Sequence, residues 1–118
     1  MRKILVVEDE DILRETYLTI LSTEPYLVDV ASNGEEALIK CQDTSYDLVL
    51  LDLMMPIMNG VDFLKHAPVA TTKIIIMSNL SSGDLLTQAI ELGAYKSVLK
   101  SDLSPKQLLA LVRYEVRS

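Results

Sequence analysis

Acidic, hydroxyl and basic residues follow the apolar runs of this sequence, at positions where they could share one site. Glu8 and Asp9 come directly after the first apolar run, and Asp52 comes directly after the third. Ser78 follows the fourth run and Lys100 follows the fifth. Ligands of open α/β sheets bind beyond the carboxyl ends of the strands. These five residues are therefore the candidate functional site.

The residue types of this set suit phosphoryl transfer. If the first and third runs are neighbouring strands, the carboxylates of Glu8, Asp9 and Asp52 converge, and they cannot all stay ionised without a countercharge. Mg²⁺ is a hard cation that prefers oxygen ligands and would supply that charge. Lys100 adds a second positive group and Ser78 a hydroxyl donor, and such groups position and neutralise a phosphoryl group. A carboxylate can itself be the nucleophile, which gives an aspartyl phosphate.

The apolar runs that precede these residues have the pattern of strands. The first, third and fourth runs are continuous, which is typical of strands buried on both faces of a parallel sheet. Asp29 interrupts the second run, which indicates a strand nearer the edge of the sheet. The five runs are Ile4–Val7, Leu27–Val30, Leu48–Leu51, Ile74–Met77 and Val98–Leu99.

The segments between the runs have the pattern of helices. Ser104, Pro105 and Gln107 are typical of a helix start with a capping box, and Gly93 stands where a helix would end. Each gap between runs leaves room for one crossover helix. The sequence therefore predicts an α/β fold, a doubly wound (βα)5 with a central five-stranded parallel sheet. Helices are expected from Asp11, from Ser32-Asn33-Gly34-Glu35, over Val61–His66, from Ser81-Ser82-Gly83-Asp84 and from Ser104.

Length and charge limit the class of protein. The 118 residues are typical of one domain, and we expect a single domain over residues 1–118. A net charge of −6 without a basic cluster argues against direct binding of nucleic acid or a membrane surface. No apolar run approaches the ~18 residues of a membrane helix. Cys41 is the only cysteine, which excludes an internal disulfide. We expect a soluble, cytoplasmic protein.

Four motifs, in this order and at this spacing, resemble those of a response-regulator receiver domain of two-component signalling. The resemblance covers the whole chain and implies a fold like that of chemotaxis regulators, with the flavodoxin-like strand order 2-1-3-4-5. The motifs are Ile4–Glu10, Leu50–Gly60, Ile75–Ser78, and Gly93-Ala94 followed by Val98-Leu99-Lys100.

The resemblance implies a role for each candidate residue. Asp52 would be the phosphoryl acceptor and a ligand of Mg²⁺. Asp9 would bind the ion directly, and Glu8 would bind it through water. Met54 would offer its backbone carbonyl to the metal, so its side chain is free to vary.

Two further residues would respond to the phosphoryl group. Ser78 would be the switch hydroxyl that closes onto it. Lys100 would pair first with Asp52 and then with the phosphoryl oxygens.

The sequence also departs from the family pattern. The family usually has Tyr or Phe three residues before the lysine, whereas this chain has Ser97, with Tyr95 two residues away. Lys100-Ser101 replaces the usual Lys-Pro, and because a non-proline cis bond costs ~3–4 kcal/mol we predict a trans peptide here. Asn79 follows the switch hydroxyl, and we predict that its amide partly covers the phosphoryl group and alters the access of water.

The resemblance also implies partners. A histidine kinase or phosphotransfer protein would donate the phosphoryl group, and a downstream effector domain or protein would bind the switched surface. That surface comprises the fourth helix, the fifth strand and the last helix, roughly Leu80–Leu92 with Val98–Leu99. The domain would be a monomer or a phosphorylation-dependent dimer. It would take part only in its own phosphorylation and hydrolysis, and is not expected to act as an enzyme on metabolites.

Two other functional hypotheses stay open. One is an interaction module with this fold that works without phosphorylation, against which the intact Asp9, Asp52 and Lys100 argue. The other is a Mg²⁺-dependent phosphohydrolase with an aspartate nucleophile. Such enzymes have a second carboxylate two residues after the first, where this chain has Met54.

Overall fold

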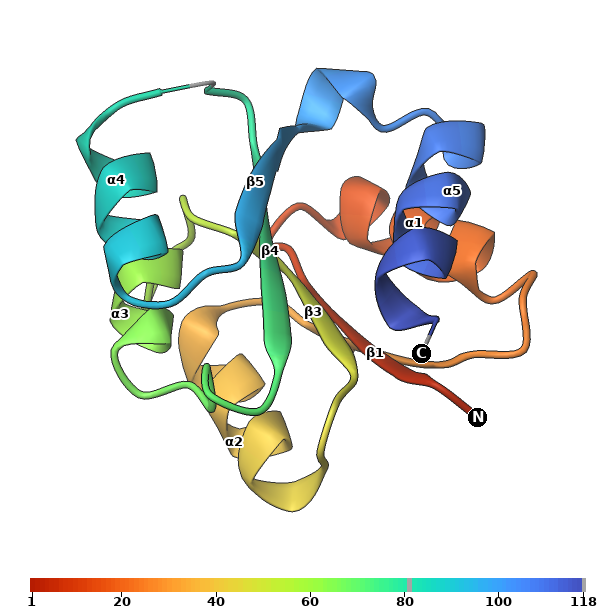
Figure 1. The fold of residues 1–118 in the computed structure, drawn as a ribbon, viewed down its shortest axis with the longest axis horizontal. Coiled ribbons are helices and arrows are strands. Elements are labelled where there is room, and N and C mark those ends of the chain that lie inside the picture. Colours follow the sequence, from red (N-terminus) through yellow and green to blue (C-terminus); the bar gives the residue numbers. More distant parts are fainter. Residues whose placement is uncertain (81, 118) are drawn as a thin grey trace.

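A computed structural model describes residues 1–80 and 82–117, and its centre is a five-stranded parallel sheet (Figure 1). The strand order is β2-β1-β3-β4-β5, as predicted. The edge position expected from Asp29 is confirmed, because β2 lies at one end of the sheet. The strands are β1 (Lys3–Val7), β2 (Leu27–Ala31), β3 (Leu48–Asp52), β4 (Lys73–Ser78) and β5 (Lys96–Leu99).

Helices cover both faces of the sheet. In Figure 1, α1 and α5 lie on one side, and α2, α3 and α4 lie on the other. The buried residues form two separate cores that match these two layers. The helices are α1 (Asp11–Leu21), α2 (Gly34–Asp43), α3 (Gly60–Leu64), α4 (Asp84–Glu91) and α5 (Pro105–Val116), and a 3₁₀ turn, η1 (Lys100–Asp102), follows β5. No helix in the described residues is long and apolar enough to cross a membrane.

The alternation of side chains along a strand explains why the central runs are continuous. In β3, Leu48 and Leu50 belong to the core under α1 and α5, whereas Val49 and Leu51 belong to the core under α2, α3 and α4. Both sets are fully buried, because helices cover both faces. In β2, by contrast, Asp29 is exposed and accepts a 2.6 Å hydrogen bond from the hydroxyl of Tyr46.

Most helix starts and stops follow local chemistry. The capping box of Ser104 and Gln107 is present, and Gly93 has a φ of +115° directly after the last turn of α4. The helix expected from Ser32 begins later, because Asn33 is the cap of α2 and accepts the bond from the Glu36 amide. The Ser32 hydroxyl instead donates to the Glu36 carboxylate at 2.8 Å.

Two other predicted boundaries change. Helix α3 spans Gly60–Leu64 rather than Val61–His66, because Asn59 caps it one residue earlier and the chain tightens into a turn after Leu64. Helix α4 begins at Asp84 after Gly83, which has no side chain with which to cap it. Ser81, predicted to open this helix, lies outside the described residues.

An ion cluster around the buried Glu115 ties α5 to the amino ends of β4 and β5. The Glu115 side chain is 1% exposed and lies 3.1 Å from the Lys73 ammonium and 2.6 Å from that of Lys96. The Lys73 ammonium also lies over the Tyr95 ring, 4.5 Å from its centre. We call Lys73, Lys96 and Glu115 the α5 clamp.

Candidate phosphoryl-acceptor site

The parallel register brings three carboxylates together at the carboxyl end of the sheet. Val7 pairs with Leu51, so β1 and β3 end side by side and their following residues meet. One carboxylate oxygen from each of Glu8, Asp9 and Asp52 lies within 4.8 Å of the others. Glu8 is fully buried and Asp52 is 6% exposed, so water alone cannot disperse their charge.

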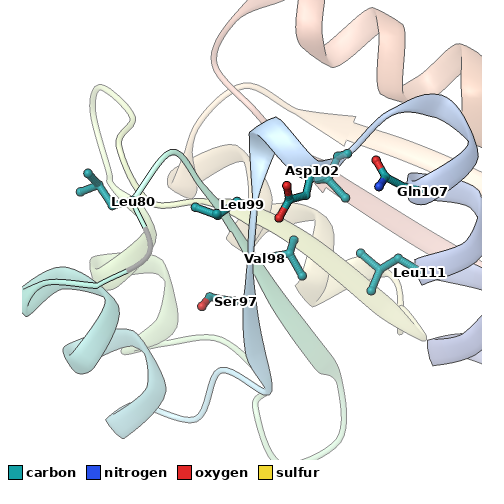
Figure 2. A pocket seen from close by; sticks show the side chains of 8 residues that line it. Leu80, Ser97, Val98, Leu99, Asp102, Gln107 and Leu111 are labelled. Atoms are coloured by element: carbon teal, nitrogen blue, oxygen red, sulfur yellow. The ribbon is translucent and has the colours of Figure 1, made fainter.

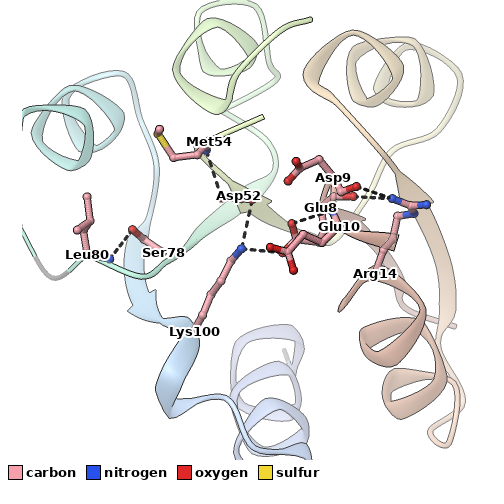
Figure 3. Close-up of polar contacts among 9 residues, drawn as sticks. All are labelled: Glu8, Asp9, Glu10, Arg14, Asp52, Met54, Ser78, Leu80 and Lys100. Atoms are coloured by element: carbon pink, nitrogen blue, oxygen red, sulfur yellow. Dashed lines mark hydrogen bonds and ion pairs between the residues drawn. The ribbon is translucent and has the colours of Figure 1, made fainter. Parts of the chain in front are cut away.

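Lys100 joins this cluster from the end of β5 (Figure 3). Its ammonium lies 2.7 Å from Glu8 Oε1 and 3.2 Å from Asp52 Oδ2. The contact with Asp52 was predicted from the sequence, whereas the contact with Glu8 was not. The longer side chain of Glu, at a position directly after β1, was the available signal for this second contact.

The close charges shift the ionisation of the site. Burial raises the pKa of the Glu8 carboxyl to about 7, with a further contribution from Asp52, and Lys100 opposes this shift. Burial alone would lower the pKa of Lys100, but its contacts with Glu8 and Asp52 outweigh burial and raise it. Lys100 is therefore charged at neutral pH, whereas Glu8 takes up a proton near neutrality in the absence of another cation.

Asp52 is oriented by the chain that follows it. Its Oδ1 accepts a 3.2 Å hydrogen bond from the Met54 amide, while Oδ2 faces Lys100. Gly60 makes this arrangement possible, because a Cβ there would lie 2.7 Å from the Asp52 carbonyl oxygen. The Met54 side chain is 66% exposed and is not packed in the core.

Arg14 fixes the loop that carries Glu8 and Asp9, and this role was not predicted from the sequence. Its guanidinium donates to the backbone carbonyls of Glu8, at 3.0 Å, and Asp9, at 3.3 Å. It also pairs with Asp11 at 2.6 Å. The spacing of Asp11 and Arg14, three residues apart on a predicted helix, was the only signal in the sequence.

Ser78 lies beside the acidic cluster but does not point its hydroxyl at Asp52. Its Oγ accepts a 2.9 Å hydrogen bond from the Leu80 amide. A hollow of about 180 Å³ nevertheless brings Ser78, Asp9, Asp52 and Lys100 to one space. Glu10, Met54, Asn79 and Leu80 line the rest of it.

Comparison with known proteins agrees with this geometry. The family model of the response regulator receiver domain matches residues 4–113. The chain belongs to this family. Receiver domains are signalling modules of two-component systems, in which phosphorylation carries the signal.

Relatives of this receiver domain occur in longer proteins. This receiver domain is 34% identical over 116 residues to the transcriptional regulatory protein ResD of Bacillus subtilis. The aligned region covers 98% of this chain and 48% of that protein. The receiver domain is 36% identical to a CpxR homolog of Haemophilus influenzae, covering 99% of this chain and 51% of that protein. The chain therefore spans about half the length of these curated relatives.

Solved structures share the fold along the whole receiver domain. The chemotaxis protein CheY4 of Vibrio cholerae superposes with a TM-score of 0.87 at 28% identity, covering 99% of each chain. A CheY-like receiver domain protein of Methanospirillum hungatei superposes with a TM-score of 0.89 at 25% identity, covering 98% of this chain and 94% of that one.

The departures from the family pattern have clear positions in the fold. The peptide between Lys100 and Ser101 is trans, as predicted. Ser97 lies on the exposed face of β5, and the strand begins only at Lys96. Tyr95 therefore lies outside the strand, where Lys73 covers its ring, and it does not replace the missing aromatic residue at position 97.

Proposed function

We propose that this receiver domain is a phospho-acceptor switch in which Asp52 takes a phosphoryl group from a histidine kinase or phosphotransfer protein. The observation that carries the proposal is the buried Asp52 carboxylate, which lies between the Lys100 ammonium and the acidic pair Glu8 and Asp9. An Asp52 oxygen attacks phosphorus, the bond from phosphorus to the histidine nitrogen breaks, and the imidazole takes up a proton.

The donor atoms of the site fit a divalent cation. Glu8, Asp9 and Asp52 offer only oxygen, and Lys100 offsets one of their three charges, which leaves two to be balanced. Hard oxygen ligands of this number suit Mg²⁺. Asp9 and Asp52, with the backbone carbonyl of Met54, would hold the ion, and Glu8 would act through water. The bound ion would neutralise charge on the phosphoryl oxygens.

Ser78 and Lys100 convert the modification into a conformational change. Phosphorylation brings a charge of about −1.5 to −2 to a site where Asp52 carried −1. Lys100 already lies 3.2 Å from Asp52 and pairs with the new oxygens. The Ser78 hydroxyl leaves the Leu80 amide and donates to a phosphoryl oxygen. This movement displaces the start of the segment before α4, and the surface of α4, β5 and α5 then binds an effector.

The phosphohydrolase reading has no support in the site. Met54 stands where such enzymes have their second carboxylate, and its side chain points out to solvent. The hypothesis of an interaction module that works without phosphorylation is tested by the labelling experiment below.

The test is phosphoryl transfer from a small-molecule phosphodonor, followed by intact mass, with and without Mg²⁺. We expect Mg²⁺-dependent labelling of the wild type and none of Asp52→Asn. Asp43→Asn, which removes an exposed carboxylate at the end of α2, is the matched control and keeps full labelling. Equal labelling of the wild type and Asp52→Asn would refute the acceptor, and no labelling of either would favour the phosphorylation-independent module.

A further inference from the structure

The exposed face of β5 is hollowed on both sides of Ser97. A hollow of about 380 Å³ lies toward α5 (Figure 2), and another of about 430 Å³ lies toward α4. Ser97 lines both, and its small side chain adds little bulk between them. We call this surface the β5 groove. Its apolar walls are Leu80, Leu99 and Leu111 on the α5 side and Leu86 and Ile90 on the α4 side.

The rim of the β5 groove is acidic. Asp102 lines the hollow beside α5, and Glu91 lines the hollow beside α4. Both are exposed, and neither forms an ion pair with any residue of the described ranges. No Lys or Arg lines either hollow. The groove therefore combines an apolar floor with two uncompensated negative charges.

We infer that the β5 groove binds a segment of a partner protein that presents an aromatic or long aliphatic side chain next to Lys or Arg. The volumes fall in the range of pockets that hold small organic ligands, which leaves room for one bulky side chain. Aromatic side chains and Arg supply much of the binding energy in protein interfaces. A second copy of this chain would place the same acids against Asp102 and Glu91, which repel it. Phosphate-bearing surfaces are repelled for the same reason.

Leu80 links the groove to the phosphoryl-acceptor site. It lines both the β5 groove and the hollow around Asp52, and its amide donates to the Ser78 hydroxyl. When that hydroxyl turns to a phosphoryl group, Leu80 loses its bond and the wall of the groove moves. This coupling between Asp52 and the β5 groove rests on the proposed function, whereas the binding of a partner segment in the groove does not. Any coupling is reciprocal, so the bound segment also changes the stability of the phosphorylated form.

The experiment is selection of peptides from a random displayed library on the wild-type chain, followed by affinity measurements on synthetic copies. We expect the selected peptides to carry an aromatic or long aliphatic residue beside Lys or Arg. Ser97→Phe, which fills the floor on an exposed strand face, should lower their affinity at least tenfold. Ser45→Phe makes the same change at an exposed position outside the groove and should bind as the wild type does.

The role of charge is tested in the same way. Asp102→Lys should lower the affinity of the chain for these peptides, and Asp43→Lys should leave that affinity unchanged. The inference is overturned if no peptide is recovered, if the peptides lack this pattern, or if they bind Ser97→Phe as tightly as the wild type. It is also overturned if the wild type self-associates in sedimentation and Ser97→Phe does not, since the occupant is then a second copy. Labelling of Asp52 is measured separately. Peptide binding without labelling overturns only the proposed function, and labelling without peptide binding overturns only the groove.

Discussion

Lys100 shares its ammonium between Glu8 and Asp52, the residue that the proposed function modifies. The side chain is only 11% exposed, so solvent weakens these contacts little. Burial nevertheless leaves Glu8 partly protonated near neutral pH, because it raises the pKa of this carboxyl to about 7 in spite of the Lys100 contact. The site is therefore sensitive to protons before any cation binds.

Glu8 makes the stability of the metal-free protein depend on pH. Its pKa rises from 4.5 in the unfolded chain to about 7 in the fold, so the folded state keeps a proton that the unfolded state loses. The free energy of unfolding therefore falls as the pH rises from about 4.5 to about 7, by a few kcal/mol at most, since each pKa unit is worth about 1.4 kcal/mol. Glu8→Gln should lack this fall.

Urea denaturation in a chelator at several pH values measures this difference. Glu35→Gln, which neutralises an exposed residue of α2, should behave as the wild type does. If the free energy of unfolding varies with pH in the same way for the wild type and Glu8→Gln, the pKa of Glu8 is not raised.

Asn79 is exposed and lines the hollow around Asp52. If its amide covers part of the phosphoryl group, Asn79→Ala should admit water and shorten the lifetime of the aspartyl phosphate a few-fold. The decay of the phosphorylated mass in a chelator measures this lifetime. Gln42→Ala, a change at an exposed position of α2, is the control, and an unchanged lifetime in Asn79→Ala would remove any role for this amide.

At the scale of elements, the connection between β3 and α3 holds backbone strain beside Asp52, the proposed acceptor. Ile57 has a φ of +66°, which a β-branched residue rarely adopts, and its side chain is 79% exposed. Packing therefore offsets little of the strain. The close approach of Gly60 to the Asp52 backbone fixes where α3 begins. The loop between the end of β3 at Asp52 and the start of α3 at Gly60 must therefore turn within a few residues.

Ile57→Gly should stabilise the protein. Such strain costs on the order of 1–3 kcal/mol, and glycine loses roughly 0.5–1 kcal/mol more backbone entropy on folding, so we expect a net gain of about 1 kcal/mol. Equilibrium urea denaturation measures it. Ile57→Val keeps the branched side chain and should bring no gain, and a glycine variant less stable than the wild type would contradict the account.

The elements themselves were largely predictable from the sequence, and the fine contacts of the site were not. Continuous apolar runs predict central strands because both faces are buried, and Asp29 marks an edge for the opposite reason. The start of α3 was misplaced because it depends on the Asn59 cap and the fit of Gly60. The Glu8–Lys100 contact joins residues 92 positions apart, and only the fold determines such a distance.

At the scale of the whole molecule, the α5 clamp joins the last helix to the sheet at the end opposite the phosphoryl-acceptor site. Glu115→Gln keeps the shape of the side chain but removes its charge, and we expect it to lower the free energy of unfolding by about 1 kcal/mol. The value is small because Lys73 and Lys96 are partly exposed and solvent screens them.

The clamp also predicts the direction of the pH effect. The two lysines outweigh burial and lower the pKa of Glu115, so its contribution is present above its unfolded pKa and is lost as the pH falls through the folded value. Unfolding of the wild type and Glu115→Gln at neutral and acidic pH should therefore converge in acid. Glu91→Gln, an exposed change on α4, is the control, and a constant difference at all pH values would contradict the clamp.

The sheet ends in two strands that have a neighbour on one side only, β2 and β5. An open strand edge is a template on which further chains can add and aggregate. Asp29 on β2 and Lys96 on β5, which also pairs with Glu115, place charged side chains on the two edge strands. Adding a strand would bury part of that charge at either end. The charged side chains on the two edge strands thus discourage growth of the sheet into fibres.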